Sequence, residues 1–163
     1  MDGRTLTPDM SSEPLVVRTL QPADIPAALP RLAAYVAGKG QASPSRHPGW
    51  LLVLQQGLKH EPYCLEASRG GRTVGLLPLA FVRSRLFGRF LVALPYLNVG
   101  GVVADDEATA VALVDRAVEL ADRLDVKHLE LRNEEPLAHT ALGHQLTSKV
   151  HMRLDLPGAP EEL

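Results

Sequence analysis

One stretch of the chain carries an apolar residue at every third or fourth position, the spacing of an amphipathic helix. Its apolar positions are Ala110, Leu113, Val114, Ala117, Leu120, Ala121 and Leu124. Three carboxylates at positions 105–107 open this helix, where the helix dipole favours negative charge. On its outer surface we expect Glu119 to pair with Arg123, because residues four apart are neighbours on a helix. The pattern predicts a helix over 105–124.

Shorter patterns predict the remaining elements. Alternating or continuously apolar runs predict strands over 15–20, 63–68, 72–82, 90–94, 126–132 and 149–156. Helical patterns cover 24–38, 49–58 and 136–142, and Pro30 is expected to kink or split the first of them. Asp24 is a candidate N-cap there. The Gly70-Gly71 pair predicts a tight hairpin turn between the second and third strands.

The order of these elements limits the fold. Strands are linked by hairpins in the middle of the chain and by helices later, which predicts an α/β fold with a mixed sheet flanked by helices. A length of 163 residues allows one domain. We expect a loose leader over 1–13, the folded domain over 14–157 and a short tail over 158–163.

Composition narrows the possible partners. The formal net charge is −2 and aromatic residues make up 4% of the chain, so we expect no strong nucleic-acid surface. Cys64 is the only cysteine, which excludes intrachain disulfides and fits a reducing compartment. The sequence contains no signal-peptide pattern and no apolar run long enough for a membrane span, so we expect a cytoplasmic protein.

Five passages together resemble a known family. They are the segments 47–50 (HPGW), 75–79 (GLLPL), 82–89 (VRSRLFGR), 94–102 (LPYLNVGGV) and 129–132 (LELR). In this order they resemble the first half of FemAB-like proteins, particularly the branch associated with PEP-CTERM/exosortase exopolysaccharide systems. The element order is similar to that of a GNAT-type acyltransferase domain. This resemblance implies a GNAT-like fold over most of the chain.

The resemblance also implies a function. FemAB-like proteins contain two GNAT-like domains and transfer acyl or aminoacyl groups in peptidoglycan or exopolysaccharide assembly, and this sequence covers the first domain. We therefore expect an acyltransferase domain that is incomplete as a catalyst alone, with an envelope precursor as substrate. The resemblance implies that a second GNAT-like domain supplies part of the cleft, and possible partners are such a domain or a second copy of this chain. Two alternatives stay open: a non-catalytic binding module, and a stand-alone acetyl-CoA-dependent N-acetyltransferase.

The segment before the long helix bears on the cofactor. A coenzyme-A-dependent GNAT enzyme holds the pyrophosphate on a glycine-rich loop at a helix N-terminus. Here the glycine pair is present within 98–107, but the leading Arg or Gln is absent and three carboxylates stand where the anion would bind. From this we expect no cofactor, and no acetyl-CoA in particular.

Two groups of residues are candidates for substrate contact: Arg83 and Ser84, in a basic hairpin that also holds Arg85 and Arg89, and Tyr96, Asn98, Gly100 and Gly101 in the following loop. The hairpin can meet a phosphate or carboxylate, and the glycines can admit a substrate to the backbone. The alternatives are a solvated turn and a structural bulge.

Other polar residues carry weaker signals. Glu130 and Arg132 lie on one face of a predicted strand, where they can orient a substrate at a splay in the sheet or form an ion pair. The six histidines do not show metal-ligand spacing, so no metal site is expected. His47 precedes Trp50 in a loop, where capping or loop packing competes with catalysis. The sequence assigns no catalytic base.

Overall fold

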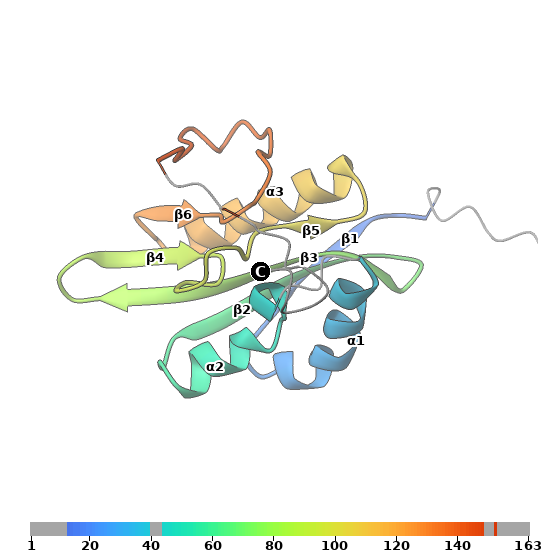
Figure 1. Ribbon diagram of the computed structural model, residues 1–163, viewed down its shortest axis with the longest axis horizontal. Helices are drawn as coiled ribbons and strands as arrows, with labels where there is room; N and C mark the ends of the chain where they lie inside the picture. Colours follow the sequence, from blue (N-terminus) through green and yellow to red (C-terminus); the bar gives the residue numbers. More distant parts are fainter. Residues whose placement is uncertain (1–12, 40–43, 149–151, 153–163) are drawn as a thin grey trace, which may run out of the picture.

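The computed structural model describes residues 13–39, 44–148 and 152 (Figure 1). Its strands are β1 (Val16–Leu20), β2 (Glu61–Arg69), β3 (Arg72–Ser84), β4 (Gly88–Val92), β5 (Val103–Ala104) and β6 (His128–Glu130). Its helices are α1 (Ile25–Gly38), α2 (Trp50–Gln56) and α3 (Glu107–Arg123), with a turn of 3-10 helix, η2, at Pro44–Arg46. No helix among these residues is long and apolar enough to cross a membrane.

The strands form one mixed sheet. Its order is β1-β2-β3-β4-β6, and β5 pairs with Gly75 and Leu76 near the start of β3. All neighbouring strands are antiparallel except β4 and β6, which run parallel with Phe90 opposite His128 and Val92 opposite Glu130. The helix between β4 and β6 is α3, as a parallel connection requires. The predicted α/β fold with a mixed sheet is confirmed.

Alternation along the strands divides the core into two layers. Leu77, Leu79 and Phe81 of β3 face α3, together with Leu91 of β4. The intervening Leu76 and Ala80 face α1 and α2 with Cys64 of β2. Figure 1 shows the corresponding arrangement, with α3 on one side of the sheet and α1 and α2 on the other. Burial raises the pKa of the Cys64 thiol to about 12, so this cysteine is an inert core residue.

The long helix begins at the expected carboxylates, one of which caps it. Asp106 is the N-cap of α3 and its Oδ1 accepts a hydrogen bond from the amide of Thr109, at 2.7 Å. The apolar stripe is buried against the sheet, as its spacing predicts. The expected outer pair is wrong, because Glu119 bonds Arg116 one turn earlier, where the shorter i,i+3 spacing brings the groups together at 2.5 Å.

Two predictions differ from the structure, and a third lies almost wholly outside the described residues. Residues 136–142 form no helix, because His139 bonds Asp115 on α3 and its Nδ1 accepts from the amide of Ala141, so local side-chain bonds replace a helical turn. Pro30 does not split α1, which continues through it. The predicted strand 149–156 lies outside the described residues except for Met152, which is not in a strand.

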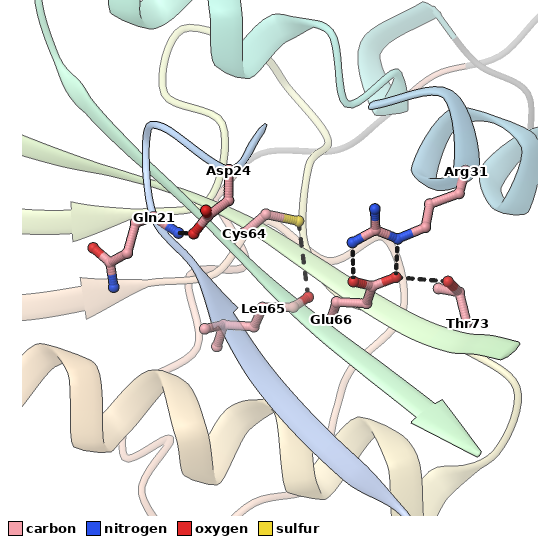
Figure 2. Close-up of polar contacts among 7 residues, drawn as sticks. All are labelled: Gln21, Asp24, Arg31, Cys64, Leu65, Glu66 and Thr73. Atoms are coloured by element: carbon pink, nitrogen blue, oxygen red, sulfur yellow. Dashed lines mark hydrogen bonds and ion pairs between the residues drawn. The ribbon is translucent and has the colours of Figure 1, made fainter. Parts of the chain in front are cut away.

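One ion pair joins α1 to the buried face of the sheet. Figure 2 shows the guanidinium of Arg31 directed at the carboxylate of Glu66 on β2, with bonds of 2.9 Å from Nε and 2.7 Å from Nη2. The hydroxyl of Thr73 on β3 donates to the same carboxylate at 2.7 Å. Burial acts to raise the pKa of Glu66, but these hydrogen bonds outweigh it and hold the pKa below its ordinary value. In the same view, Asp24 accepts from the amide of Gln21 and does not cap α1 through its side chain.

Candidate functional site

A pocket of about 380 Å³ lies on the face of the sheet opposite α3. Its walls come from β3, β4, β6 and the segment that follows each of the last two strands: Val82, Phe90, Val92, Pro95, Tyr96, His128, Glu130 and Arg132. Neither α1 nor α2 contributes a wall, since these helices pack over β2 and β3. The pocket combines apolar walls with a carboxylate, a guanidinium, an imidazole and a phenol, as small-molecule sites do.

The loop 94–99 forms one side of the pocket because it is anchored to the strand beside it. Where β4 ends, the amide of Ala93 donates to the carbonyl of Glu130 at 2.8 Å. The chain then leaves the sheet and returns at Gly100 and Gly101, whose amides both donate to the carbonyl of Arg132 at 3.1 Å. The parallel strands β4 and β6 therefore diverge, and residues 94–99 occupy the splay between them.

The glycine pair is packed against neighbouring chain. A Cβ at Gly100 would lie 2.6 Å from the Cβ of Leu94, and one at Gly101 would lie 1.7 Å from Oδ1 of Asn133. The same Oδ1 accepts from the amide of Val102 at 2.8 Å. The glycine amides are bonded to the protein, and neither glycine lines the pocket. Both glycines are needed for the loop to close on β6.

Tyr96 stands at the rim of the pocket in a strained backbone conformation. Its φ is +72° and that of Leu94 is +42°, a region that large side chains rarely adopt. The Tyr96 ring stacks on His60 with centroids 5.8 Å apart, and its hydroxyl lies 2.8 Å from His60 Nε2. Burial lowers the pKa of His60, which favours the neutral imidazole. Strain of this kind persists where surrounding contacts enforce it, and it clusters at functional sites.

Glu130 and Arg132 lie side by side in the pocket wall. Arg132 Nε donates to Glu130 Oε1 at 2.8 Å, and its Nη1 donates to the carbonyl of Leu97 at 2.5 Å. The ion pair expected from the sequence is therefore present, and both residues also line the pocket, while orientation of a substrate stays a prediction. Each side chain keeps about a third of its surface exposed, 36% for Glu130 and 28% for Arg132. Both groups remain accessible to a small ligand.

The basic hairpin does not contribute cations to this pocket. Arg83 stacks over Phe81 and pairs with Glu61, while Arg89 pairs with Asp125 at the end of α3. These contacts place both guanidinium groups on the α3 side of the sheet. Ser84 accepts from the amides of Leu86 and Phe87, so its hydroxyl shapes the turn.

Of the six candidate contact residues, Tyr96 alone lines the pocket. Asn98 is exposed on the loop beside it, and Arg83 and Ser84 lie in the hairpin. The structure adds His60, His128, Glu130 and Arg132 to the neighbourhood of Tyr96. The alternation that places Glu130 and Arg132 on one face of a strand could have predicted that they lie together. No sequence pattern links His60 to Tyr96, which is 36 positions away.

The N-terminus of α3 is occupied by the chain's own carboxylates. Asp106 caps the helix and accepts from Arg69 at 2.6 Å, and these bonds lower its pKa to about 2. Asp105 accepts from the hydroxyl of Tyr35 at 2.6 Å and pairs with Lys39 at 2.5 Å. The side chain of Asp106 therefore occupies the amide of Thr109, and carboxylates lie where a phosphate would place its negative charge.

Comparison with solved structures identifies the fold. An aminoglycoside acetyltransferase from an uncultured soil metagenomic sample aligns with a TM-score of 0.53 and 14% identity, over 90% of this chain and 99% of the other. A predicted acetyltransferase from Clostridium acetobutylicum, solved with acetyl-CoA, aligns with a TM-score of 0.51 and 13% identity, over 87% and 96%. The chain has the fold of GNAT acetyltransferases. A GNAT family acetyltransferase from Staphylococcus aureus aligns with a TM-score of 0.50 and 13% identity, over 87% and 98%.

Sequence comparisons add nothing finer to this GNAT-like domain. No family model matches the chain, and no curated protein matches it. The likeness to GNAT structures supports a GNAT-like domain, which was one part of the resemblance noted in the sequence. The narrower FemAB-like assignment, and with it a role in peptidoglycan or exopolysaccharide assembly, has no support from these comparisons.

One expectation needs correction. We expected no cofactor, yet a protein of the same GNAT fold is solved with acetyl-CoA. The sequence argument weighed a single feature, the helix N-terminus. The structure adds a second feature, the pocket, whose lining combines the apolar side chains of Val82, Phe90 and Val92 with the guanidinium of Arg132.

Proposed function

We propose that this GNAT-like domain is an acetyl-CoA-dependent N-acetyltransferase that acts on an amine bound in the pocket between β4 and β6. The observation that carries the proposal is the convergence of Glu130, Arg132 and the His60–Tyr96 pair on one pocket at the splay of the two parallel strands. The shared fold with acetyltransferases supports the reaction class. The pocket chemistry supports an amine as the acceptor.

The carboxylate of Glu130 is the group that would hold the amine. Amines carry a positive charge at neutral pH, and a carboxylate about one third exposed in an apolar recess binds an ammonium through a charge-assisted hydrogen bond. Arg132 fixes the orientation of this carboxylate through its bond to Oε1. The guanidinium is itself held by the carbonyl of Leu97, so the pair is positioned by the loop that closes the pocket.

Tyr96 and His60 together can remove the proton. In the tautomer with the ring proton on Nδ1, His60 Nε2 accepts the hydrogen of the Tyr96 hydroxyl. The Tyr96 oxygen can then take a proton from the amine while its own proton passes to His60. Burial keeps His60 neutral at pH 7 by lowering its pKa, which prepares it for this role. Tyr96 is the catalytic residue, and His60 acts through it.

Acetyl-CoA supplies an acetyl thioester, so that a C–N bond to the amine forms, the C–S bond breaks, and the released sulfur takes up one proton. Val82, Phe90 and Val92 would surround this end of the molecule and exclude water. Arg132 would face its polar groups. Positioning of the two reactants in one recess is the main contribution that such a site makes to the rate.

The test is acetyl transfer by the purified chain. The protein is incubated with acetyl-CoA and a panel of amines: aminoglycosides, polyamines, amino sugars and short peptides. Released coenzyme A is followed with a chromogenic thiol reagent, and acetylated products are identified by mass spectrometry. Cys64 is fully buried, so the protein's own thiol does not contribute to the signal. The proposal is supported if the release of coenzyme A depends on the amine and the product is heavier than the amine by about 42 mass units, the gain from one acetyl group.

A second candidate is transfer to an envelope precursor, the narrower function that the FemAB-like resemblance implies. It is favoured by one observation: Val82, Pro95, Tyr96, Glu130 and Arg132 of the pocket come from passages that carry that resemblance. Peptidoglycan and exopolysaccharide precursors with free amines belong in the same assay. Activity on these alone, or only when a second GNAT-like domain is added, would favour the envelope function over a general amine acetyltransferase.

A non-catalytic module is the remaining alternative. It predicts that no member of the panel is acetylated and that acetyl-CoA does not raise the melting temperature of the chain, since a ligand that binds only the folded state stabilises it. An envelope partner, self-association and the cytoplasmic location expected from the sequence stay predictions.

A further inference from the structure

The turn between β3 and β4 exposes two large apolar side chains at the end of a projecting hairpin. Leu86 is 82% exposed and Phe87 64% exposed, among the most exposed large apolar side chains in the described part of the chain. Figure 1 shows this hairpin extending beyond the layers of helices that cover the sheet. The turn is well defined, because the amides of Leu86 and Phe87 both donate to Ser84 Oγ. The apolar pair is therefore held outward by the local hydrogen bonding.

Positive charge surrounds this apolar tip. Arg83 and Arg89 flank the turn in register, and Arg85 is exposed within it. The side chain of Lys127 lies over Gly88, where a Cβ would be 3.2 Å from its Cδ. Two of these cations are paired, Arg83 with Glu61 and Arg89 with Asp125. Among the described residues named here, four cations against two carboxylates leave an excess of two positive charges, on a chain whose net charge is −2.

An apolar tip ringed by cations is the pattern of a segment that docks on an anionic lipid surface. The apolar side chains enter the boundary between headgroups and acyl chains, while the cations remain among the headgroup phosphates. A soluble polyanion such as a nucleic acid would bind the cations, but it would not bury the apolar side chains of Leu86 and Phe87. The tip also stands apart from the pocket, because Arg83 and Arg89 lie on the α3 side of the sheet.

We propose that the β3–β4 hairpin tip, Arg85 to Gly88, docks this domain on the surface of a membrane rich in anionic lipid. The contact is peripheral and reversible. Only two apolar side chains and an excess of two cations predict weak binding that depends on anionic lipid and falls with salt. The contact would place the pocket near the membrane without occupying it. This proposal stands whether or not the domain acetylates amines.

The experiment is flotation of the purified chain with two kinds of vesicle. One contains phosphatidylcholine alone, and the other contains phosphatidylcholine with roughly 40% phosphatidylglycerol. We expect binding to the anionic vesicles only. The double variant Leu86→Ser/Phe87→Ser should reduce partitioning about tenfold, and Arg85→Gln should reduce it about fivefold. All three side chains are exposed, so the variants are expected to fold as the parent does.

Matched controls use exposed residues away from the tip. Val53 and Leu58, on and after α2, are each 50% exposed, and Arg72 is exposed at the opposite end of β3. Val53→Ser/Leu58→Ser and Arg72→Gln should leave vesicle binding unchanged. Absence of binding to anionic vesicles, or equal losses in tip and control variants, overturns the proposal. Binding that survives Leu86→Ser/Phe87→Ser but is displaced by heparin overturns it in favour of a general polyanion site.

Discussion

The hydroxyl of Tyr96 lies 2.8 Å from Nε2 of His60, and the two rings stack within 11° of parallel. This contact joins the loop between β4 and β5 to the connection between α2 and β2. Tyr96, whose backbone φ is positive, therefore lies at the rim of the pocket with its hydroxyl against the imidazole of His60. Burial lowers the pKa of that imidazole. In the proposed function this pair is the proton acceptor, a role for which the sequence offered no candidate.

The first prediction concerns the pH dependence of transfer. Transfer requires neutral His60, so kcat/KM should rise with pH through the pKa of His60 and then level. Because burial lowers this pKa, the acid limb should lie below pH 6.5, the ordinary value of the group. His60→Gln should remove this limb and reduce kcat by about a hundredfold. His144→Gln, at an exposed histidine, is the control and should change neither. An unaltered acid limb in His60→Gln would exclude His60 from the proton path.

The second prediction concerns the acceptor. Glu130→Gln removes the negative charge that would hold the ammonium, so KM for a cationic amine should rise about tenfold, the value of one charge-assisted hydrogen bond. The change in kcat should be smaller, because the proton acceptor is retained. Glu135→Gln, at an exposed glutamate outside the pocket lining, should behave like the parent. A loss confined to kcat would show that Glu130 does not bind the amine.

The third prediction concerns the closure of the loop. Gly101→Ala forces a Cβ into the space of the Asn133 side chain and within 2.8 Å of its backbone nitrogen. We expect a loss of about 1–3 kcal/mol in the free energy of unfolding, measured by urea denaturation, as for other overpacked sites. Gly143→Ala is the matched control, since a Cβ there meets nothing within 4 Å. Equal stability of the two variants would mean that the loop does not need the close approach at Gly101.

The fourth prediction concerns the pair between α1 and β2. Arg31→Met leaves the Glu66 carboxylate, 8% exposed, with Thr73 as its remaining side-chain partner. Loss of a fully buried partner costs about 3–5 kcal/mol. Arg31 itself is 49% exposed, so we expect about 1–2 kcal/mol. Arg72→Met, at an exposed arginine, should cost less than about 0.5 kcal/mol.

The same pair has a pH signature. The folded state lowers the pKa of Glu66, so the unfolded chain binds its proton more readily. The stabilisation is therefore present above the ordinary pKa near 4.5 and is lost as the pH falls below it. Urea titrations at pH 7 and at about pH 4 should show a smaller difference between the parent and Arg31→Met at the lower pH. A constant difference would contradict the assigned cause.

Elements with a strong period of apolar residues could be predicted from the sequence, whereas elements with a weak period could not. The stripe on α3 and the glycine turn between β2 and β3 are each specified within one short segment, and both formed as expected. Residues 136–142 have a helical composition, but His139 reaches Asp115 on α3, and that contact between distant segments takes precedence. The two-residue strand β5 is too short to show any period.

The site was harder to predict for the same physical reason. Tyr96 was a candidate from the sequence, and Glu130 and Arg132 share a face by simple alternation. The role of the glycine pair depends on Asn133, more than 30 residues away, which fills the space beside Gly101. His60 meets Tyr96 only because the loop adopts positive φ angles at Leu94 and Tyr96. Neither contact leaves a local pattern in the chain.

The most direct test of the proposed site is acetyl transfer by Tyr96→Phe compared with Tyr63→Phe. Each change removes one hydroxyl, but Tyr63 is buried on the α3 side of the sheet, where its hydroxyl bonds Glu61. We predict amine-dependent transfer by the parent chain, nearly the same rate for Tyr63→Phe, and a loss of kcat of about a hundredfold or more for Tyr96→Phe. Equal rates for the two variants, or no transfer by the parent to any amine, would contradict the assignment of this pocket as an acetyl-transfer site.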